Sequence, residues 1–136
     1  MKKLVYIAGP LYTPGERAHI EEIGRICTKA GFAVYLPHKD AGIYSGKGPT
    51  KKFFETDMRA MDKCCFSIAV LDGFDVDSGT SFEAGYLYAS GKPVIGLLID
   101  IRFPHPREQI NLMLVNGMEK IVRSYEELGR AIWAYK

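Results

Sequence analysis

Residues 65–100 read CFSIAVLDGFDVDSGTSFEAGYLYASGKPVIGLLID, and this stretch decides the fold. It holds two short apolar runs, CFSIAVLDG at 65–73 and KPVIGLLID at 92–100, on either side of a segment with helical features, TSFEAGYLYASG at 80–91. Short apolar runs bounded by turn residues are typical of buried strands, and a helix between two of them forms a right-handed crossover. The stretch therefore predicts two parallel strands of one sheet, joined by a helix.

The same alternation of strand and helix continues along the whole chain. Apolar runs predict the strands, and segments of helical period predict the helices. Additional strands are expected at 3–9, 32–37 and 119–124, and additional helices at 15–31, 51–64 and 125–136. Loops are expected at 38–50 and 101–109, and residues 110–117 have a mixed pattern. We therefore expect one α/β domain over residues 1–136, with an open, mostly parallel five-stranded sheet and helices on both faces, as in flavodoxin-like and Rossmann-like folds.

The composition excludes several classes of protein. Eighteen Lys and Arg against sixteen Asp and Glu leave a net charge of +2 with no basic patch, so nucleic acid is not an expected partner. The cysteines are three in number and two are adjacent, which does not suit a disulfide framework. No apolar run approaches the roughly eighteen residues of a membrane span, so no membrane partner is expected. We expect a soluble, cytoplasmic protein with reduced thiols.

Polar, glycine-rich loops follow the first three expected strands. They read AGPLYTPGE at 8–16, PHKDAGIYSGKG at 37–48 and DVDSGTSFEAG at 75–85. In an open parallel sheet the carboxyl ends of the strands hold the ligand, so these loops are expected to converge on one pocket. The candidate pocket residues are Gly9, Pro10, Leu11, Asp40, Asp77, Ser78 and Gly79.

The third loop carries three carboxylates, Asp75, Asp77 and Glu83, close together in the chain. Carboxylates repel one another and are costly to desolvate, so their grouping indicates a shared ligand, metal or reaction. A structural alternative is that Thr80 and Glu83 form a capping box at the start of a helix, after a solvated acidic turn. The residues taken alone leave both interpretations open.

Neither a metal nor an organic cofactor is expected. His19, His38 and His105 lack the spacing of metal ligands and are expected on helix surfaces or in loops. The first loop has neither the G-x-G-x-x-G pattern nor the lysine of a P-loop, so nucleotide binding of those two types is not expected.

Three ordered segments resemble the nucleoside 2-deoxyribosyltransferase family. They are VYIAGPLY at 5–12, DVDSGTSFEAGYLYASGKPVIG at 75–96 and INLMLVNGMEKIVRSYEEL at 110–128. The resemblance implies an enzyme that moves 2-deoxyribose from one nucleobase to another. Its partners would be small nucleosides and free nucleobases.

The resemblance also implies a role for each matching residue. Glu83 corresponds to the nucleophile, and Tyr6 to the hydrogen-bond partner that orients it. Asp77 and Asn111 match the residues that hold the sugar 5′-hydroxyl, and Met113 belongs to the same N-L-M motif as Asn111. Because the family's asparagine comes from a neighbouring subunit, we expect a homo-oligomer whose active sites are completed by Asn111 of a neighbour.

The chemistry of an N-glycosidic bond suits this assignment. The bond breaks through an oxocarbenium-like state, which a carboxylate can flank and trap as an ester at C1′. Glu83 is expected in the first helical turn, where the helix dipole favours its ionised form and a nearby aspartate opposes it. A second carboxyl group, Asp75 or Asp40, would protonate the departing base, and the sequence does not separate these two.

Two positions depart from the family pattern. Cys65 stands where an aspartate is expected before the third strand, and Leu11 and Tyr12 replace a tryptophan and phenylalanine pair, so the base-binding wall is expected to differ. One alternative function is a 5′-monophosphate N-glycosidase of the same superfamily, against which Asp77 argues because a carboxylate repels a phosphate. The other is a non-catalytic nucleotide-binding module on the same fold, in which Glu83 serves only as a helix cap.

Overall fold

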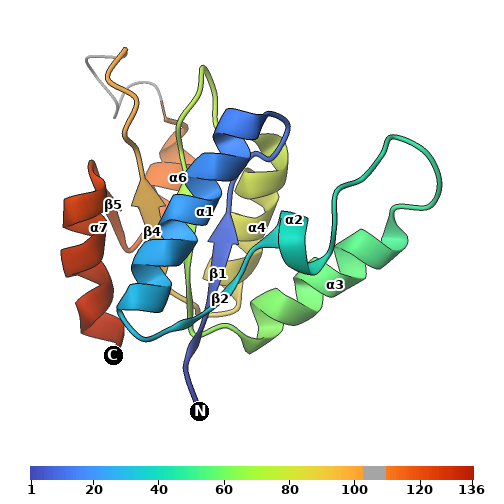
Figure 1. Cartoon of the computed structure of the whole chain (residues 1–136). Coiled ribbons are helices and arrows are strands. Elements are labelled where there is room, and N and C mark those ends of the chain that lie inside the picture. Colours follow the sequence, from blue (N-terminus) through green and yellow to red (C-terminus); the bar gives the residue numbers. More distant parts are fainter. Residues whose placement is uncertain (103–109) are drawn as a thin grey trace.

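In the computed structural model, which describes residues 1–102 and 110–136, the chain forms a five-stranded sheet in the order β2-β1-β3-β4-β5 (Figure 1). Every neighbouring pair of strands is parallel. The strands are β1 (Leu4–Ala8), β2 (Ala33–Tyr35), β3 (Phe66–Val70), β4 (Val94–Leu97) and β5 (Lys120–Val122). The expected α/β fold with a parallel five-stranded sheet is confirmed.

Helices cover both faces of this sheet (Figure 1). They are α1 (Pro14–Lys29), α2 (Pro37–Asp40), α3 (Lys51–Lys63), α4 (Ser78–Ala89), α6 (Leu112–Gly117), α7 (Tyr125–Ile132) and a 3-10 helix at Trp133–Tyr135. α1 and α7 share one apolar core with the sheet, and α3 and α4 share a second core with its other face, where α6 packs beside α4. Within the described residues, no helix is both long enough and apolar enough to cross a membrane.

The alternation of side chains along β1 explains why the two faces differ. Val5 and Ile7 point into the core shared with α1 and α7, whereas Tyr6 and Ala8 point to the side of α3 and α4. Tyr6 is completely buried, and it is the register partner of Tyr35 in β2. The sheet therefore presents two tyrosines side by side to α3 and α4.

The start of α4 differs from the prediction. The helix begins at Ser78 rather than at Thr80, because Asp77 is the N-cap residue and its Oδ2 atom accepts the Thr80 backbone N–H at 2.9 Å. The structural alternative of a capping box between Thr80 and Glu83 is therefore contradicted. Glu83 lies in the second turn of α4 rather than the first, beyond the free N–H groups of the helix end.

Two segments without a clear helical period form short helices. Pro37 opens α2, and the Leu36 backbone N–H donates to Asp40 Oδ2 at 2.7 Å. Asn111 is the N-cap of α6, and its Oδ1 atom accepts the Met113 backbone N–H at 2.9 Å. Local capping, not apolar periodicity, determines both helices. The loop predicted at 101–109 lies largely outside the described residues.

Candidate active site

The carboxyl group of Glu83 points from α4 toward β1 and α3. The residue is partly buried, and its Oε2 atom is shielded from solvent. Burial raises the pKa of Glu83 to about 8; a hydrogen bond from Tyr6 lowers it, and the charges of Asp57 and Asp77 raise it further. The helix dipole was expected to favour the ionised form of this carboxyl, with a nearby aspartate opposing it, but Glu83 lies in the second turn and desolvation is the largest cause of its pKa shift. Perturbation of this kind is typical of reactive groups in enzymes.

Tyr6 is the neighbour of Glu83 on the sheet side. Burial raises the pKa of its hydroxyl, and the negative charge of Glu83 and then that of Asp57 raise it further. The hydroxyl therefore keeps its proton and serves as a donor at neutral pH. Neither the Tyr6 hydroxyl nor Glu83 Oε2 has a partner at full hydrogen-bond geometry among the described residues, although the two are close enough for Tyr6 to lower the pKa of Glu83.

Asp57 of α3 is a second carboxyl group at this place, and the sequence analysis did not identify it. Its pKa is raised by burial and lowered by a hydrogen bond from Tyr35, whose hydroxyl donates to Asp57 Oδ1 at 2.8 Å. One sequence signal was available. Phe53, Asp57 and Met61 are spaced by four residues, so an acid occupies the face of the predicted helix that turns inward.

The carboxylates of Asp77 and Asp40 lie at the margin of the same site. Asp77 is near enough to raise the pKa of Glu83, and its charge is the largest cause of the raised pKa of Tyr12. Its Oδ2 atom also accepts the Thr80 hydroxyl at 3.0 Å, so this oxygen has two protein donors. The charge of Asp40 contributes to the raised pKa of Tyr35, while its Oδ2 atom accepts the Leu36 backbone N–H at the start of α2.

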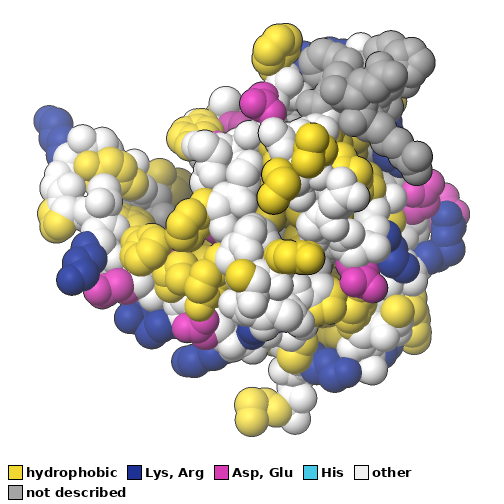
Figure 2. All heavy atoms as spheres, turned by 180° about the vertical axis from the view of Figure 1, so that it is seen from behind, with side chains coloured by type: hydrophobic (Ala, Val, Ile, Leu, Met, Phe, Trp, Pro, Cys, Tyr) yellow, Lys and Arg dark blue, Asp and Glu magenta, His cyan; other side chains and the backbone are white. Residues whose placement is uncertain are grey.

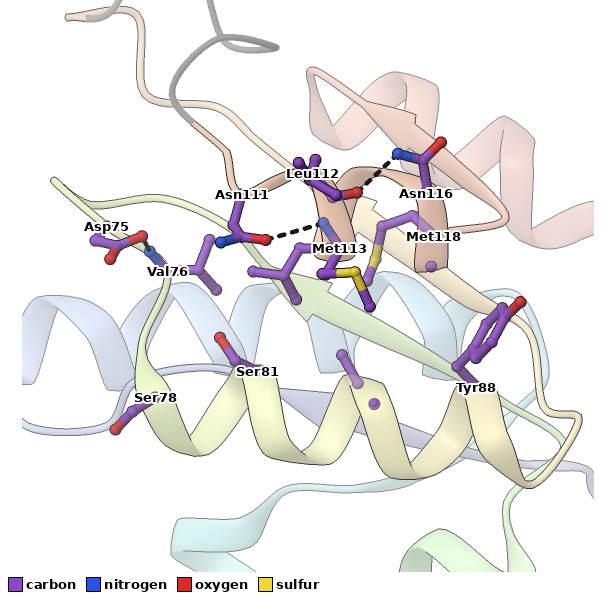
Figure 3. A pocket seen from close by; sticks show the side chains of 14 residues that line it. Asp75, Val76, Ser78, Ser81, Tyr88, Asn111, Leu112, Met113, Asn116 and Met118 are labelled. Carbon is purple, nitrogen blue, oxygen red and sulfur yellow. Dashed lines mark hydrogen bonds between the residues drawn. The ribbon is translucent and has the colours of Figure 1, made fainter.

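Four other candidate residues lie in a different part of the molecule. Asp75, Ser78, Asn111 and Met113 line a groove of about 860 Å³ between α4 and α6 (Figure 3). Asp75 Oδ1 accepts the backbone N–H of the next residue, and Asn111 Oδ1 is used as the cap of α6, which leaves the Asn111 amide nitrogen free to donate. Glu83 does not line this groove. Within one chain, Asn111 and Asp75 therefore lie on the groove side of α4, and Glu83 does not.

The glycines, Leu11 and Pro10 of the candidate loops lie close to other parts of the fold. A Cβ atom at Gly9 would lie 2.5 Å from Ile20 Cδ1 and 3.1 Å from Val70 Cβ, so a side chain at this position would require Ile20 and Val70 to shift. Leu11 packs against the core of α1, and a Cβ atom at Gly79 would lie 3.3 Å from Asp77 Oδ2. Pro10 lines a separate cleft of about 290 Å³ on the α1 side of the sheet.

The described residues contain no group of three or more His, Cys, Asp or Glu side chains that could hold a metal ion. His19 Nδ1 is 2.5 Å from the Tyr125 hydroxyl, and His38 is buried with its Nε2 atom 3.0 Å from Glu21 Oε1. The expectation of a surface position is therefore wrong for His38, because α2 turns its ring toward α1. His105 lies outside the described residues.

Comparison with known proteins places this geometry in a family. A sequence model described as nucleoside 2-deoxyribosyltransferase matches residues 5–118. The chain belongs to this family. The deoxyribosyltransferase identified from the resemblance of the three segments is thus confirmed at the level of the family, and the family consists of enzymes.

Individual members and neighbours of the family are similar over most of the chain. An uncharacterized protein of Schizosaccharomyces pombe is 36% identical over 107 residues, which are 72% of this chain and 51% of that protein, so the chain spans about half the length of this relative. The 2-deoxyribosyltransferase of Bacillus psychrosaccharolyticus has a TM-score of 0.80 and 20% identity, with 97% of this chain and 94% of that chain covered. The CMP N-glycosidase of Clostridium botulinum has a TM-score of 0.62 and 22% identity, with 98% and 100% covered. The deoxyribosyltransferase family and the N-glycosidase thus share one fold.

The raised pKa of Glu83 predicts a pH-dependent stability. A carboxyl group that is harder to ionise when folded stabilises the native state at low pH, and this contribution is lost as the pH rises from about 4.5 to about 8. Relative to Glu83→Gln, the wild-type free energy of unfolding should fall over this window, by on the order of 1.4 kcal/mol for each unit of pKa difference at most. Urea unfolding of both proteins across this pH range measures the difference.

A matched control for this experiment is Glu55→Gln, because Glu55 is an exposed glutamate of α3 that forms an exposed ion pair with Lys51 at 3.6 Å. Its unfolding free energy should run parallel to that of the wild type from acidic to mildly alkaline pH. If Glu83→Gln also runs parallel to the wild type, the carboxyl of Glu83 is not desolvated in the folded protein.

Proposed function

We propose that the protein transfers 2-deoxyribose between nucleobases, by cleaving the N-glycosidic bond of deoxynucleosides through a covalent intermediate on Glu83. The observation that carries this proposal is the Glu83 carboxyl, shielded from water between the Tyr6 hydroxyl and a second carboxyl, that of Asp57. Membership of the deoxyribosyltransferase family supports the substrate class. Because Glu83 is not a helix cap, the feature that would have favoured a purely binding module is missing.

The first half of the reaction forms an ester with the enzyme. A carboxylate oxygen of Glu83 attacks C1′ as the bond from C1′ to the base nitrogen breaks, and the electrons of that bond leave with the base. Asp57 donates a proton to the departing base and becomes a carboxylate. Positive charge develops on the sugar in the transition state, and the ionised Glu83 stabilises it because the site excludes water.

The second half reverses these steps with another base. The incoming base nitrogen attacks C1′, the ester bond to Glu83 breaks, and Asp57 takes up the proton that the base releases. Two displacements at C1′ retain its configuration. Between them the two carboxyl groups need one proton: Glu83 is ionised when it attacks, and Asp57 is protonated when it donates. Burial raises both pKa values, that of Glu83 to about 8, so without substrate the pair holds its proton on Glu83 at neutral pH. In this proposal substrate binding shifts that proton to Asp57 before Glu83 attacks.

Asp57 is a better candidate for the acid than the two carboxyl groups considered from the sequence. Its charge acts directly on Glu83, and its pKa is raised, as a proton donor near neutral pH requires. Asp75 lies in the groove beyond α4, and Asp40 is engaged by the Leu36 backbone N–H. In this proposal Asp40 and Asp75 do not protonate the departing base. They contact another part of the substrate or the neighbouring subunit.

The groove between α4 and α6 is the proposed contact with a second copy of the chain. Asn111 would reach the Glu83 site of that copy, and the Glu83 site of one chain would receive Asn111 from the other. Figure 2 shows hydrophobic side chains gathered on the face of α3, α4 and α6. The exposed large hydrophobic residues of these helices are Phe54, Phe82, Tyr88, Leu112 and Met113. A face of this kind is typical of a protein interface.

The test of the proposed function is turnover of deoxynucleosides with and without a second free base, followed by chromatography. We expect base exchange that depends on the second base. We also expect 2′-deoxynucleosides to react roughly 100-fold faster than their 5′-monophosphates, about 2.7 kcal/mol in transition-state binding, because the Asp77 carboxylate repels a 5′-phosphate. Asp77→Asn should narrow this ratio, whereas Glu126→Gln, which removes an exposed charge on α7, should not.

The principal alternative is hydrolysis of a nucleoside 5′-monophosphate, the substrate type named for the Clostridium botulinum N-glycosidase. One observation favours it, since Asp77 already accepts two donors from Thr80 and is thus partly neutralised toward a substrate. Faster cleavage of monophosphates, with release of free base and no exchange, would establish this alternative. Absence of turnover with every nucleoside and nucleotide would contradict both enzymatic proposals.

A further inference from the structure

Tyr35 makes two contacts at the candidate site at the same time. Its hydroxyl donates to Asp57 Oδ1 at 2.8 Å, and its ring stacks on the ring of Tyr6 with a centroid distance of 5.3 Å and an interplanar angle of 14°. Tyr35 and Tyr6 are register partners in the parallel pair of β2 and β1, which fixes how their rings face each other. The two tyrosines therefore form one stacked unit of the sheet.

Each tyrosine of this unit contacts one of the two carboxyl groups of the site. Tyr6 interacts with Glu83 of α4, and Tyr35 holds Asp57 of α3. α3 follows residues 42–50, which are almost entirely exposed, and its buried residues are Ala60 and Met61 in its second half. The Tyr35 hydroxyl therefore fastens the first half of α3 to the sheet at the position of its carboxyl group.

We propose that Tyr35 is a positioning residue, which holds Asp57 in the orientation that protonates the departing base. This inference rests on the proposed function. The bond from Tyr35 occupies Oδ1 and leaves Oδ2 to carry the proton. That proton passes from Asp57 Oδ2 to the base nitrogen as the electrons of the C1′ bond move onto the base, and the Tyr35 hydroxyl stays protonated and stabilises the carboxylate that remains.

The electrostatics of Tyr35 agree with this geometry. Its pKa is raised by burial and by the hydrogen bond to Asp57, so the hydroxyl remains a donor throughout the reaction. The bond in turn lowers the pKa of Asp57 against the effect of burial. A donor that stabilises the ionised product makes Asp57 a stronger acid, which matters only for a base that must be protonated to leave.

The test compares two leaving groups in the Tyr35→Phe variant, which keeps the stacked ring and removes the hydroxyl. With ordinary deoxynucleosides we expect kcat to fall by about 10-fold to 100-fold, with little change in KM, since general acid catalysis is worth roughly 100-fold or more in total. With 4-nitrophenyl 2-deoxyriboside, whose leaving group departs as a stable anion, the rate of 4-nitrophenolate release should stay within about twofold of the wild type.

The matched control is Tyr86→Phe. It removes another tyrosine hydroxyl that donates to an aspartate of α3, Asp62, at 2.5 Å, at a partly buried position one turn of α4 after Glu83. Neither Tyr86 nor Asp62 is among the groups that shift the pKa of Glu83. Both substrates should react at wild-type rates in this variant. In an Asp57→Asn background, which should also slow only the ordinary deoxynucleosides, adding Tyr35→Phe should cause no further loss because the two residues act as one unit.

Two outcomes would overturn the inference. Equal slowing of both substrates by Tyr35→Phe would show that the hydroxyl only supports the fold, and a full additional loss in the Asp57→Asn background would show that it acts independently of Asp57. In either case the wild type still turns over deoxynucleosides, and the proposed function stands. A wild type that turns over neither substrate would overturn the inference together with the proposed function.

Discussion

Glu83→Gln is expected to lose deoxyribosyl transfer by at least about a thousandfold while the protein stays folded. Glutamine has the shape of glutamate but cannot form the ester at C1′, and removal of a nucleophile typically costs several orders of magnitude in kcat. The change removes no helix cap, because Asp77 and not Glu83 caps α4. Initial rates of base exchange, with circular dichroism to confirm the fold, measure the effect.

A direct observation of the intermediate complements this variant. Wild-type protein mixed with a deoxynucleoside and quenched rapidly should carry a deoxyribosyl adduct on the peptide that contains Glu83, as detected by mass spectrometry. Glu83→Gln and Glu83→Ala should carry none. The control is Glu55→Gln, whose side chain lies exposed on α3 and which should form the adduct normally. Near-normal exchange by Glu83→Ala would remove Glu83 from the mechanism.

Mixing two inactive variants is expected to restore activity. If each active site joins Glu83 of one subunit to Asn111 of the other, a mixed dimer of Glu83→Ala and Asn111→Ala chains has one site with both residues intact. Random pairing of equal amounts yields about half mixed dimers, so the mixture should reach about a quarter of the wild-type rate. Neither variant alone should exceed background.

The measurement needs a step that exchanges subunits, such as mild denaturation and refolding of the combined proteins. Asn116→Ala is the matched control for Asn111→Ala, since Asn116 belongs to the same short helix and its amide donates to the Leu112 carbonyl at 2.7 Å. That variant should be active alone. If refolded mixtures stay inactive although mixed dimers are present, Asn111 serves its own chain or has no part in the site. A protein that sediments as a monomer with full activity would contradict the shared site as well.

The order of strands and helices could be predicted from the sequence, because burial leaves a visible pattern in each. Strands buried in the sheet are short apolar runs, and helices that pack on the sheet have apolar residues at helical spacing. The runs at 65–73 and 92–100 contain β3 and β4, and the helix between them exists. Its start was misplaced, since Thr80 and Glu83 fit a capping box as well as Asp77 fits an N-cap. Which of two possible N-cap residues starts a helix depends on the backbone conformation at each of them. A pattern of residue types does not contain that conformation.

The composition of the site was only partly predictable, for a different reason. Glu83 and Tyr6 come from segments that match the family, whereas Asp57 and Tyr35 meet through the pairing of β1 with β2 and the packing of α3. A contact of this kind, between residues far apart in the chain, depends on tertiary structure that a single sequence does not reveal. The resemblance assigns Asn111 to the site of a neighbouring subunit, and within one chain Asn111 lines the groove between α4 and α6, which Glu83 does not line.

The strand order has a consequence for how the chain is made. β1 is paired on one side with β2, which follows soon after it, and on the other with β3, which begins only at Phe66. Contacts between segments so distant in sequence form slowly, because a long stretch of chain must be restrained first. During synthesis β1 is paired only with β2 until β3 leaves the ribosome, and α1 covers one face of this pair while the face of Tyr6 and Tyr35 stays uncovered. We expect slow translation before β3 to prolong the exposure of that apolar face and to increase aggregation of nascent chains.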